Sequence, residues 1–191
     1  MPPADSTQPV RCPWATGDLL AGYHDTEWGV PVHDDRRHFE FILLEGAQAG
    51  LSWVTVLRRR EGYRRCFADF DPVAVAAFDA ARIDELVRDA GIIRNRAKIV
   101  AAVSNARVLL DVAAEHGTFD AYLWGHTGGR VVRRDPADQG WRATSPLSDG
   151  IASELRRRGM RFFGSTICYA HLQAVGVVND HLASCFRYAL L

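Results

Sequence analysis

Four side chains of metal-binding type lie near the two ends of the chain. His181 and Cys185 are four residues apart, so on a helix both would face one side and could chelate one ion. Cys12 and His24 lie near the other end. Two sulfurs and two imidazoles form the closed tetrahedral set of structural zinc, which leaves no position for water. Because the Cys12–His24 gap matches no standard zinc finger, a chance pair at His181 and Cys185 stays the alternative.

The other two cysteines, Cys66 and Cys168, stand in apolar surroundings, which favours small core residues. The first eleven residues are polar and Pro-rich, with no apolar signal-peptide core, and no apolar run approaches the length of a membrane span. We therefore expect a cytoplasmic protein with no membrane partner.

A second segment with chemical potential is Leu-Arg-Arg-Arg-Gly-Met-Arg-Phe-Phe-Gly-Ser-Thr, residues 155–166. One predicted helix ends in it, the chain turns at Gly164, and Ser165 or Thr166 begins a second helix. Backbone N–H groups at a helix start can hold a phosphate, and arginines such as Arg161 surround this corner. The segment predicts a helix-hairpin-helix element that contacts DNA. An ordinary helical hairpin with a solvated arginine face is an equally weighted alternative.

A carboxylate interrupts an apolar run at Glu45, which follows Phe-Ile-Leu-Leu and precedes Gly-Ala. Tyr23, Trp28 and Trp53 are the aromatic residues concentrated around it in the sequence. These residues could form a pocket with one acidic group. The alternative is a carboxylate at the edge of the core, held by an arginine or a helix N-terminus, among aromatic residues that are simply core.

The elements that must position these side chains are helical. Capping residues and apolar spacing predict helices from Asp34-Asp35 to Gly50, from Ser52 to about Arg60, and at 71–78, 81–90, 95–117, 148–159 and 165–175, with a last one starting at Asn179. No stretch shows sustained strand alternation, so we predict an all-α fold of about eight to ten helices. Residues 125–146 are expected to form an exposed loop. We divide the chain into a flexible extension, 1–11, and a single domain, 12–191, built from two closely packed helical subdomains with the hairpin at about 155–170.

Composition is that of an ordinary globular protein: 191 residues, 48% hydrophobic and 24% charged. The 23 basic and 23 acidic residues cancel, which excludes a protein that binds polyanions by bulk charge but not one with a local basic patch. The arginines at 58–60 and 64–65 are expected on solvated helix faces. Lys98 is the only lysine, so any lysine nucleophile has one candidate.

Several blocks together resemble the DNA-3-methyladenine glycosylase I family of the helix-hairpin-helix glycosylase superfamily. They are YHDTEWGVP at 23–31, LEGAQAGLSW at 44–53, DAGIIRNRAKI at 89–99, GSTICY at 164–169 and QAVGVVNDH at 173–181, followed by Cys185. The resemblance runs in order from about Cys12 to Cys185, and only residues 125–146 are unmatched.

The resemblance implies roles for particular residues. It places the ligands of one structural Zn²⁺ on Cys12, His24, His181 and Cys185, and the base pocket on Glu45, Tyr23, Trp28 and Trp53. The superfamily usually has a catalytic Asp where this chain has Asn179. Its bifunctional members have a Schiff-base lysine at the start of the second hairpin helix, which is absent here. The resemblance therefore implies a monofunctional glycosylase without lyase activity.

The implied reaction is hydrolytic excision of 3-methyladenine from alkylated double-stranded DNA in base excision repair, which leaves an abasic site and free 3-methyladenine. The cationic base is attracted by aromatic faces and hydrogen-bonded by Glu45, the expected catalytic residue. Gly50 and Leu51 are a candidate wedge for the opened duplex, with a buried core position as the alternative for Leu51. Phosphate contacts are expected from Arg161, Gly164, Ser165 and Thr166. We expect a bacterial monomer associated with the nucleoid through DNA.

Two other classes of function remain as alternatives. One is a catalytically silent DNA-binding module that keeps the hairpin and the zinc. A pocket that keeps Glu45 and its aromatic neighbours argues against it. The other is a zinc hydrolase, which would need an open coordination position that four protein ligands do not leave.

Overall fold

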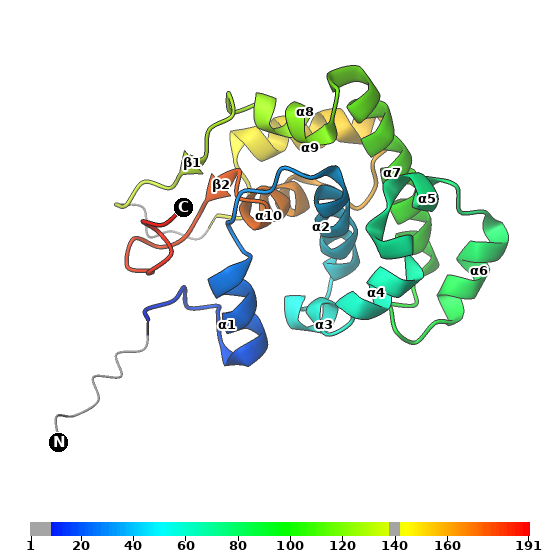
Figure 1. Ribbon diagram of the computed structural model, residues 1–191, viewed down its shortest axis with the longest axis horizontal. Helices are drawn as coiled ribbons and strands as arrows, with labels where there is room; N and C mark the ends of the chain where they lie inside the picture. Colours follow the sequence, from blue (N-terminus) through cyan, green and yellow to red (C-terminus); the bar gives the residue numbers. More distant parts are fainter. Residues whose placement is uncertain (1–8, 138–141) are drawn as a thin grey trace.

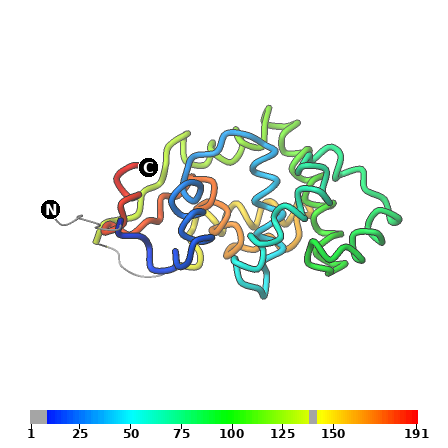
Figure 2. Tube along the Cα trace, turned by 60° about the horizontal axis from the view of Figure 1, so that its bottom comes forward, coloured from blue at the N-terminus to red at the C-terminus, as the bar shows by residue number. Residues whose placement is uncertain are grey.

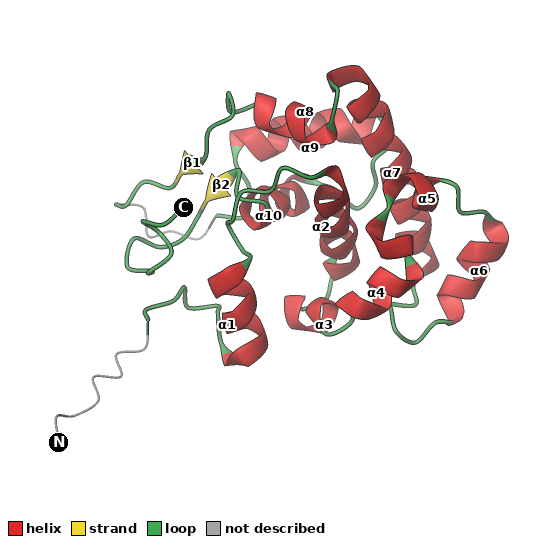
Figure 3. Cartoon of the chain, in the orientation of Figure 1, coloured by secondary structure: helices red, strands yellow, loops and turns green. Residues whose placement is uncertain are grey.

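Helices dominate the computed structural model, which describes residues 9–137 and 142–191 (Figures 1 and 3). None of the helices in these ranges is long and apolar enough to cross a membrane. In chain order the elements are α1 (Gly17–Thr26), α2 (Asp35–Gln48), α3 (Trp53–Leu57), α4 (Arg60–Cys66), the 3-10 turn η1 (Ala68–Phe70), α5 (Pro72–Ala76), α6 (Ala80–Arg88), α7 (Arg96–His116), α8 (Phe119–Gly125), β1 (Val132–Arg133), α9 (Pro146–Arg157), α10 (Ser165–Ala174) and β2 (Val178–Asn179).

Most predicted helix starts are confirmed by side-chain caps. Asp34, Asp71 and Asn95 each accept a hydrogen bond from a backbone N–H in the first turn of the following helix. Helix α9 begins earlier than predicted, because Ser145 and not Ser148 is its N-cap. Ser148 instead completes a reciprocal capping box with Ser145.

Other parts differ from the predictions. Helix α1 was not predicted, and residues from His181 onward form turns rather than the expected last helix. Strands β1 and β2 pair in parallel, with Val132 opposite Val178, so the described part of the predicted 125–146 loop is partly structured. Two-residue strands are too short for a periodic signal, and pairing across more than forty residues leaves no local mark in the sequence.

Two helices organise the packing. Helix α7 packs against α5, α6, α8 and α2, and α10 packs against α9 and α2. Helix α2 therefore lies between the two groups, with Phe39, Phe41 and Leu44 fully buried. Both ribbon views place the start and the end of the described chain together at one end of the molecule, and α6 at the other (Figures 1 and 2). Cys66 and Cys168 are buried core residues, as predicted.

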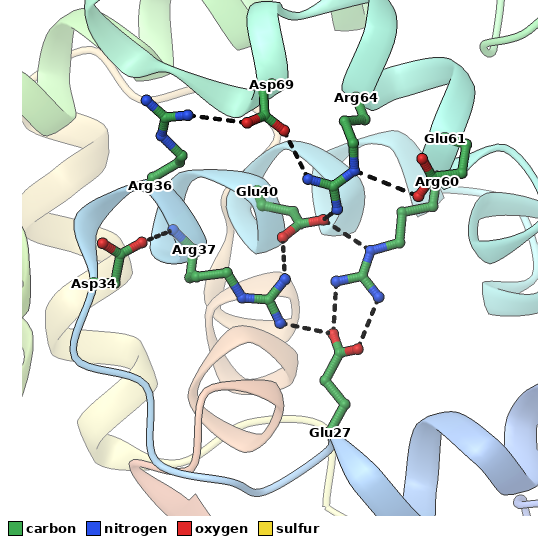
Figure 4. A network of polar contacts seen from close by, with 9 residues as sticks. All are labelled: Glu27, Asp34, Arg36, Arg37, Glu40, Arg60, Glu61, Arg64 and Asp69. Carbon is green, nitrogen blue, oxygen red and sulfur yellow. Dashed lines mark hydrogen bonds and ion pairs between the residues drawn. The ribbon is translucent and has the colours of Figure 1, made fainter.

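An ion-pair network joins α1, α2 and α4 (Figure 4). The buried carboxylate of Glu40 accepts hydrogen bonds from Arg37, Arg60 and Arg64, and Arg60 also forms two hydrogen bonds of 2.7 and 2.8 Å with Glu27. The prediction that Arg60 and Arg64 lie on solvated faces is therefore wrong. The network joins Glu27, the residue directly after α1, to α2 and α4.

Candidate functional site

The four residues predicted to form a pocket, Glu45, Tyr23, Trp28 and Trp53, line one cavity of about 300 Å³. Helices α1, α2, α3 and α10 and the loops next to them supply its walls. We call this cavity the aromatic pocket. Sequence reasoning missed the other residues that line it, Trp14, Leu20, Gln48, Ala170 and Gln173.

Glu45 is the acidic group of the aromatic pocket and is only 4% exposed. Its Oε2 atom is sealed from solvent and has no hydrogen-bond partner among the described residues. Burial raises the pKa of Glu45 to about 8. The alternative of a core carboxylate held by an arginine is contradicted, since no cation among the described residues pairs with it. A buried, unpaired acid lowers the free energy of unfolding. Such a group is therefore a candidate for binding a ligand.

The aromatic residues that line the pocket lie close to one another. Tyr23 and Trp53 lie with ring centroids 5.5 Å apart, and Trp14 meets Trp28 edge-on at 5.0 Å. Burial and then the nearby Glu45 charge raise the pKa of Tyr23 well above its usual value. The indole Nε1 of Trp53 is also buried without a partner. The pocket thus offers aromatic faces, one unused donor and one unused acceptor to a planar, cationic ring.

The four predicted metal ligands form one buried cluster whose ligand atoms all lie within 4.8 Å of one another. Cys185 Sγ lies 3.4 Å from His24 Nε2 and 3.4 Å from His181 Nδ1, and Cys12 Sγ lies 3.6 Å from His181 Nδ1. In a tetrahedral site with Zn–S of about 2.3 Å and Zn–N of about 2.0 Å, sulfur and nitrogen are about 3.5 Å apart. The cluster therefore has the dimensions that a tetrahedral ion requires, although His181 and Cys185 lie in turns and not on a helix.

The chemistry of the donor set fits a metal ion as well. His24 Nδ1 hydrogen-bonds to Asp25 at 2.8 Å and His181 Nε2 to the Trp28 carbonyl at 3.3 Å, which leaves the other nitrogen of each ring for the ion. Burial lowers the pKa of His181 to about 4, so this ring is neutral, as a ligand must be. Burial raises the pKa of Cys12 to about 12, so a thiolate there needs a bound cation. The Trp28 ring lies against His181 at 4.4 Å and joins the cluster to the aromatic pocket.

The predicted hairpin joins two packed helices, α9 and α10. The exposed Arg161 has its N–H and its carbonyl held by the side chain of Asn105 at 2.8 and 2.9 Å, so the connection is fixed to α7. Ser165 donates its hydroxyl to Asp149, whereas Thr166 at the same helix start is exposed. The backbone N–H groups of this corner, and not the Ser165 hydroxyl, are what it offers to a phosphate.

A second cavity of about 260 Å³ adjoins the aromatic pocket, and we call it the groove. Gly50, Leu51 and Thr166 line the groove, so the candidate wedge and the helix start lie on one surface. Leu51 is 41% exposed, which contradicts the buried-core alternative, and Gly50 turns the chain with a φ of +78°. Gln48, Ala170 and Gln173 line both cavities.

Two residues that the sequence singled out do not reach the aromatic pocket. Asn179 is fully buried and donates to the carbonyls of Tyr188 and Leu191, both at 3.1 Å. Lys98 donates to the carbonyls of Ala47 and Ala49 and so caps the end of α2. The described residues therefore place neither a catalytic Asp equivalent nor a lysine nucleophile at the pocket.

The pocket residues that were not predicted are only weakly marked in the sequence. Trp14 follows Cys12 by two residues and could have been grouped with the metal ligands. Gln48 and Gln173 stand inside two of the matched sequence blocks. A neutral amide in a helix gives no signal by itself, because its use depends on which atoms the fold places beside it.

Comparisons with known proteins agree on one family. The family model described as "Methyladenine glycosylase" matches residues 14–188. DNA-3-methyladenine glycosylase 1 of Escherichia coli K12 is 46% identical over 181 residues, which are 93% of this chain and 96% of that protein. DNA-3-methyladenine glycosylase of Haemophilus influenzae is 40% identical over 178 residues, 92% and 96% of the two chains. The solved structure that describes 3-methyladenine recognition by 3-methyladenine DNA glycosylase I from Staphylococcus aureus matches with a TM-score of 0.89 and 30% identity, over 93% of this chain and 96% of that one.

Proposed function

The chain belongs to the methyladenine glycosylase family, and on that premise we propose that it excises 3-methyladenine from alkylated DNA by hydrolysis in base excision repair. Its similarity to named DNA-3-methyladenine glycosylases covers nearly the whole of both chains. The similar Staphylococcus aureus structure is described by its recognition of 3-methyladenine. The product is free 3-methyladenine, and the DNA keeps an abasic site.

The observation that carries the proposal is the buried, unpartnered carboxyl of Glu45 in an aromatic pocket. 3-Methyladenine in DNA bears a positive charge, which attracts both aromatic faces and a carboxylate. An undamaged adenine brings no charge to offset the cost of a buried carboxylate, so the pocket rejects it. Glu45 therefore selects the damaged base, while Trp53 and Tyr23 stack on it after it leaves the duplex.

The charge of the substrate also explains which catalytic groups the pocket does without. When the bond from the base to the sugar breaks, its electron pair neutralises the cationic base, which leaves as a neutral molecule. Such a leaving group needs no strong general acid. The buried, internally bonded Asn179 is consistent with this, and the position of Lys98 at the end of α2 supports a reaction without a lyase step.

Zinc completes the proposal as a structural ion. Cys12, His24, His181 and Cys185 would hold it, and when bound it would fix the two ends of the chain to each other. Four protein ligands leave no position for water, so the ion takes no part in hydrolysis. The ion would affect the aromatic pocket by holding His181, because the carbonyl and the ring of Trp28 both contact His181.

DNA lies along the groove in this proposal. Backbone N–H groups near Gly164, Ser165 and Thr166 hold a phosphate, helped by the exposed Arg161. This use makes α9, α10 and their connection a helix-hairpin-helix element. Leu51, exposed beside Gly50, fills the gap that the flipped base leaves in the stack. A monomer suffices, since one chain supplies both the pocket and the groove.

Base release from methylated DNA tests the proposed function. The protein is incubated with DNA treated with a methylating agent, the freed bases are separated by chromatography, and the strands are examined on a denaturing gel. We expect 3-methyladenine in the supernatant and unbroken strands that carry abasic sites. Folded, zinc-loaded protein that binds DNA and releases no base would instead indicate a silent DNA-binding module.

A further inference from the structure

Gln173 lies at the boundary between the aromatic pocket and the groove. It stands near the end of α10, is 9% exposed and lines both cavities. Among the described residues, Gln48 and Ala170 are the other two that line both cavities. A nucleotide with its base in the pocket and its phosphates along the groove must pass its deoxyribose across this boundary, because the sugar links the two.

The amide of Gln173 is held in one orientation. Its Nε2 donates to Asp180 Oδ2 at 2.6 Å, and Arg134 Nη1 donates to Asp180 Oδ1 at 3.1 Å. The side chains of Arg134 and Asp180 are 4% and 6% exposed, so the ion pair behind the amide is buried and ordered. A carboxylate only accepts hydrogen bonds, and the amide therefore cannot flip without losing its partner.

The other end of this amide is available. Among the described residues no hydrogen bond reaches Gln173 Oε1, and this atom is not one of the polar atoms sealed from solvent. Because Nε2 is committed to Asp180, the exposed end of the amide is its negative end. Within the described chain the Gln48 side chain makes no such anchoring bond, and Ala170 has no polar group, so Gln173 is the fixed dipole at this boundary.

We propose that Gln173 is a catalytic residue that contacts the deoxyribose of the flipped nucleotide through Oε1 and stabilises the positive charge that develops on the sugar. Asp180 and Arg134 are positioning residues that act through it. This inference rests on the proposed function. A dipole oriented before the reaction needs no rearrangement when charge appears, which is the condition for electrostatic stabilisation of a transition state.

The step at the sugar is a hydrolysis. The bond between the base nitrogen and C1′ breaks, its electron pair stays on the base, and the cation is left on C1′ and the ring oxygen. A water molecule adds to C1′ and gives one proton to solvent, which completes the abasic site. Gln173 Oε1 forms no covalent bond in this sequence and faces the cation while it exists.

The variant Gln173→Met keeps the length of the side chain and removes both polar atoms. We expect the single-turnover rate of 3-methyladenine release to fall by about tenfold or more, because an oriented dipole that faces the developing charge is lost. The Kd for free 3-methyladenine should stay close to that of the wild type, since the contact is to the sugar, whereas the melting temperature should fall because the buried Asp180 loses one donor. Gln173→Leu serves as a second apolar variant if the first folds poorly.

Binding of abasic-site analogues separates a contact to the sugar cation from a structural role. Duplexes with a pyrrolidine analogue, cationic at neutral pH, and with a neutral tetrahydrofuran analogue are compared for the wild type and Gln173→Met. We expect the wild type to bind the cationic duplex more tightly than the neutral one. In the variant the ratio of the two Kd values should fall by about tenfold, while its Kd for the neutral duplex stays unchanged. A structural defect would weaken both duplexes alike.

The results of these experiments test the role of Gln173 separately from the proposed glycosylase function. A wild-type protein that releases no 3-methyladenine overturns the proposed function. A wild type that releases the base, with a Gln173→Met variant that is equally fast, overturns the role of Gln173 alone. If the variant is slow and its Kd for free 3-methyladenine rises by the same factor, Gln173 contacts the base. That result would overturn the contact to the sugar.

Discussion

At the scale of single residues, the buried carboxyl of Glu45 lowers the stability of the fold, and we propose that the same carboxyl is needed for function. Its carboxyl is buried, and among the described residues it has no cation beside it and no donor on Oε2, so folding carries a desolvation cost. Stability alone would favour an amide or an apolar side chain there. A cationic ligand offsets that cost, and the same group can therefore select the ligand that carries the charge.

This conflict predicts that Glu45→Gln stabilises the protein. A carboxyl whose pKa is about 8 when folded and about 4.5 when unfolded loses stability as pH rises between these values. We expect the variant to be more stable by up to about 4 kcal/mol at pH 7.5, and by less than about 1 kcal/mol at pH 5. Urea unfolding at both pH values measures this difference. A variant that is less stable at both would show that Glu45 is held by a partner in the fold.

The same pKa predicts how activity depends on pH. The carboxylate form is the one that attracts the cationic base, so kcat/KM should rise with pH and level off above about 8, the pKa of Glu45 in the free enzyme. Initial rates on methylated DNA between pH 6 and 9.5 give this profile. Glu45→Gln should show low activity without the inflection. An inflection that persists in the variant would assign the titration to another group.

At the scale of elements, helix starts that depend on neighbouring residues could be predicted from the sequence. Strands and turns that depend on residues far away in the sequence could not. The starts of α2, α5 and α7 follow from Asp34, Asp71 and Asn95, whose side chains bond the backbone within three residues. Strand β2 and the turns after it depend on β1 and on the residues around Cys12, which are remote in sequence. The helix predicted from Asn179 was wrong: Asn179 ends strand β2, its Oδ1 accepts from the N–H of His181, and its Nδ2 donates to the carbonyls of Tyr188 and Leu191.

The same division applies to the site. Glu45 drew notice because it interrupts an apolar run and has aromatic residues near it in the sequence, but the residues alone left a structural carboxylate as the alternative, and the family resemblance assigned the pocket. Gln173 was not identifiable, since its amide becomes significant only when Asp180 and Arg134 hold it. The four Cys and His residues were suggested as metal ligands by residue type and by the family resemblance, but only the fold places Cys12 and His24 beside His181 and Cys185.

The packing of α2 against α10 buries two histidines and predicts an acid sensitivity. The His38 and His171 rings lie 5.6 Å apart, and burial lowers the pKa of both, that of His171 well below its usual value. Asp120 accepts from His38, whereas both ring nitrogens of His171 lack partners among the described residues. A base with a depressed folded pKa destabilises the fold as pH falls below its unfolded value of about 6.5.

We therefore expect His171→Leu to reduce the loss of stability between pH 7 and pH 5 by about 2 kcal/mol. The other titrating groups, including the histidines of the metal cluster, are common to both proteins and cancel in the comparison. Urea unfolding at the two pH values, with metal content checked at each, gives the difference. An equal loss in the variant would show that His171 does not take up a proton on unfolding.

At the scale of the whole molecule, the two ends of the described chain meet at the metal cluster. Val10 accepts a backbone hydrogen bond from Phe186, and Arg11 pairs with Asp25 beside His24, so these two residues of the predicted flexible extension are held in place. The rest of that extension, 1–8, lies outside the described residues. The aromatic pocket is built from elements near both ends, α1 and α10, and its shape depends on this closure.

Removal of zinc should therefore loosen the pocket along with the ends. We expect one zinc per chain by elemental analysis, and a Tm lower by about 10 °C or more after chelation or in Cys185→Ser. Free 3-methyladenine should then bind more weakly, because Trp28 loses its support from His181. Cys66→Ala is the matched control and should retain the zinc. Wild-type protein that contains no zinc and keeps its Tm with chelator would contradict the structural metal.

We propose that Glu45 gives this protein its activity on a cationic base. The most direct measurement is the single-turnover rate of 3-methyladenine release from one methylated DNA by the wild type, Glu45→Gln and the exposed-site control Glu61→Gln. We predict that Glu45→Gln is folded and slower by about 100-fold or more, while Glu61→Gln matches the wild type. A Glu45→Gln rate within about twofold of the wild type would contradict the account.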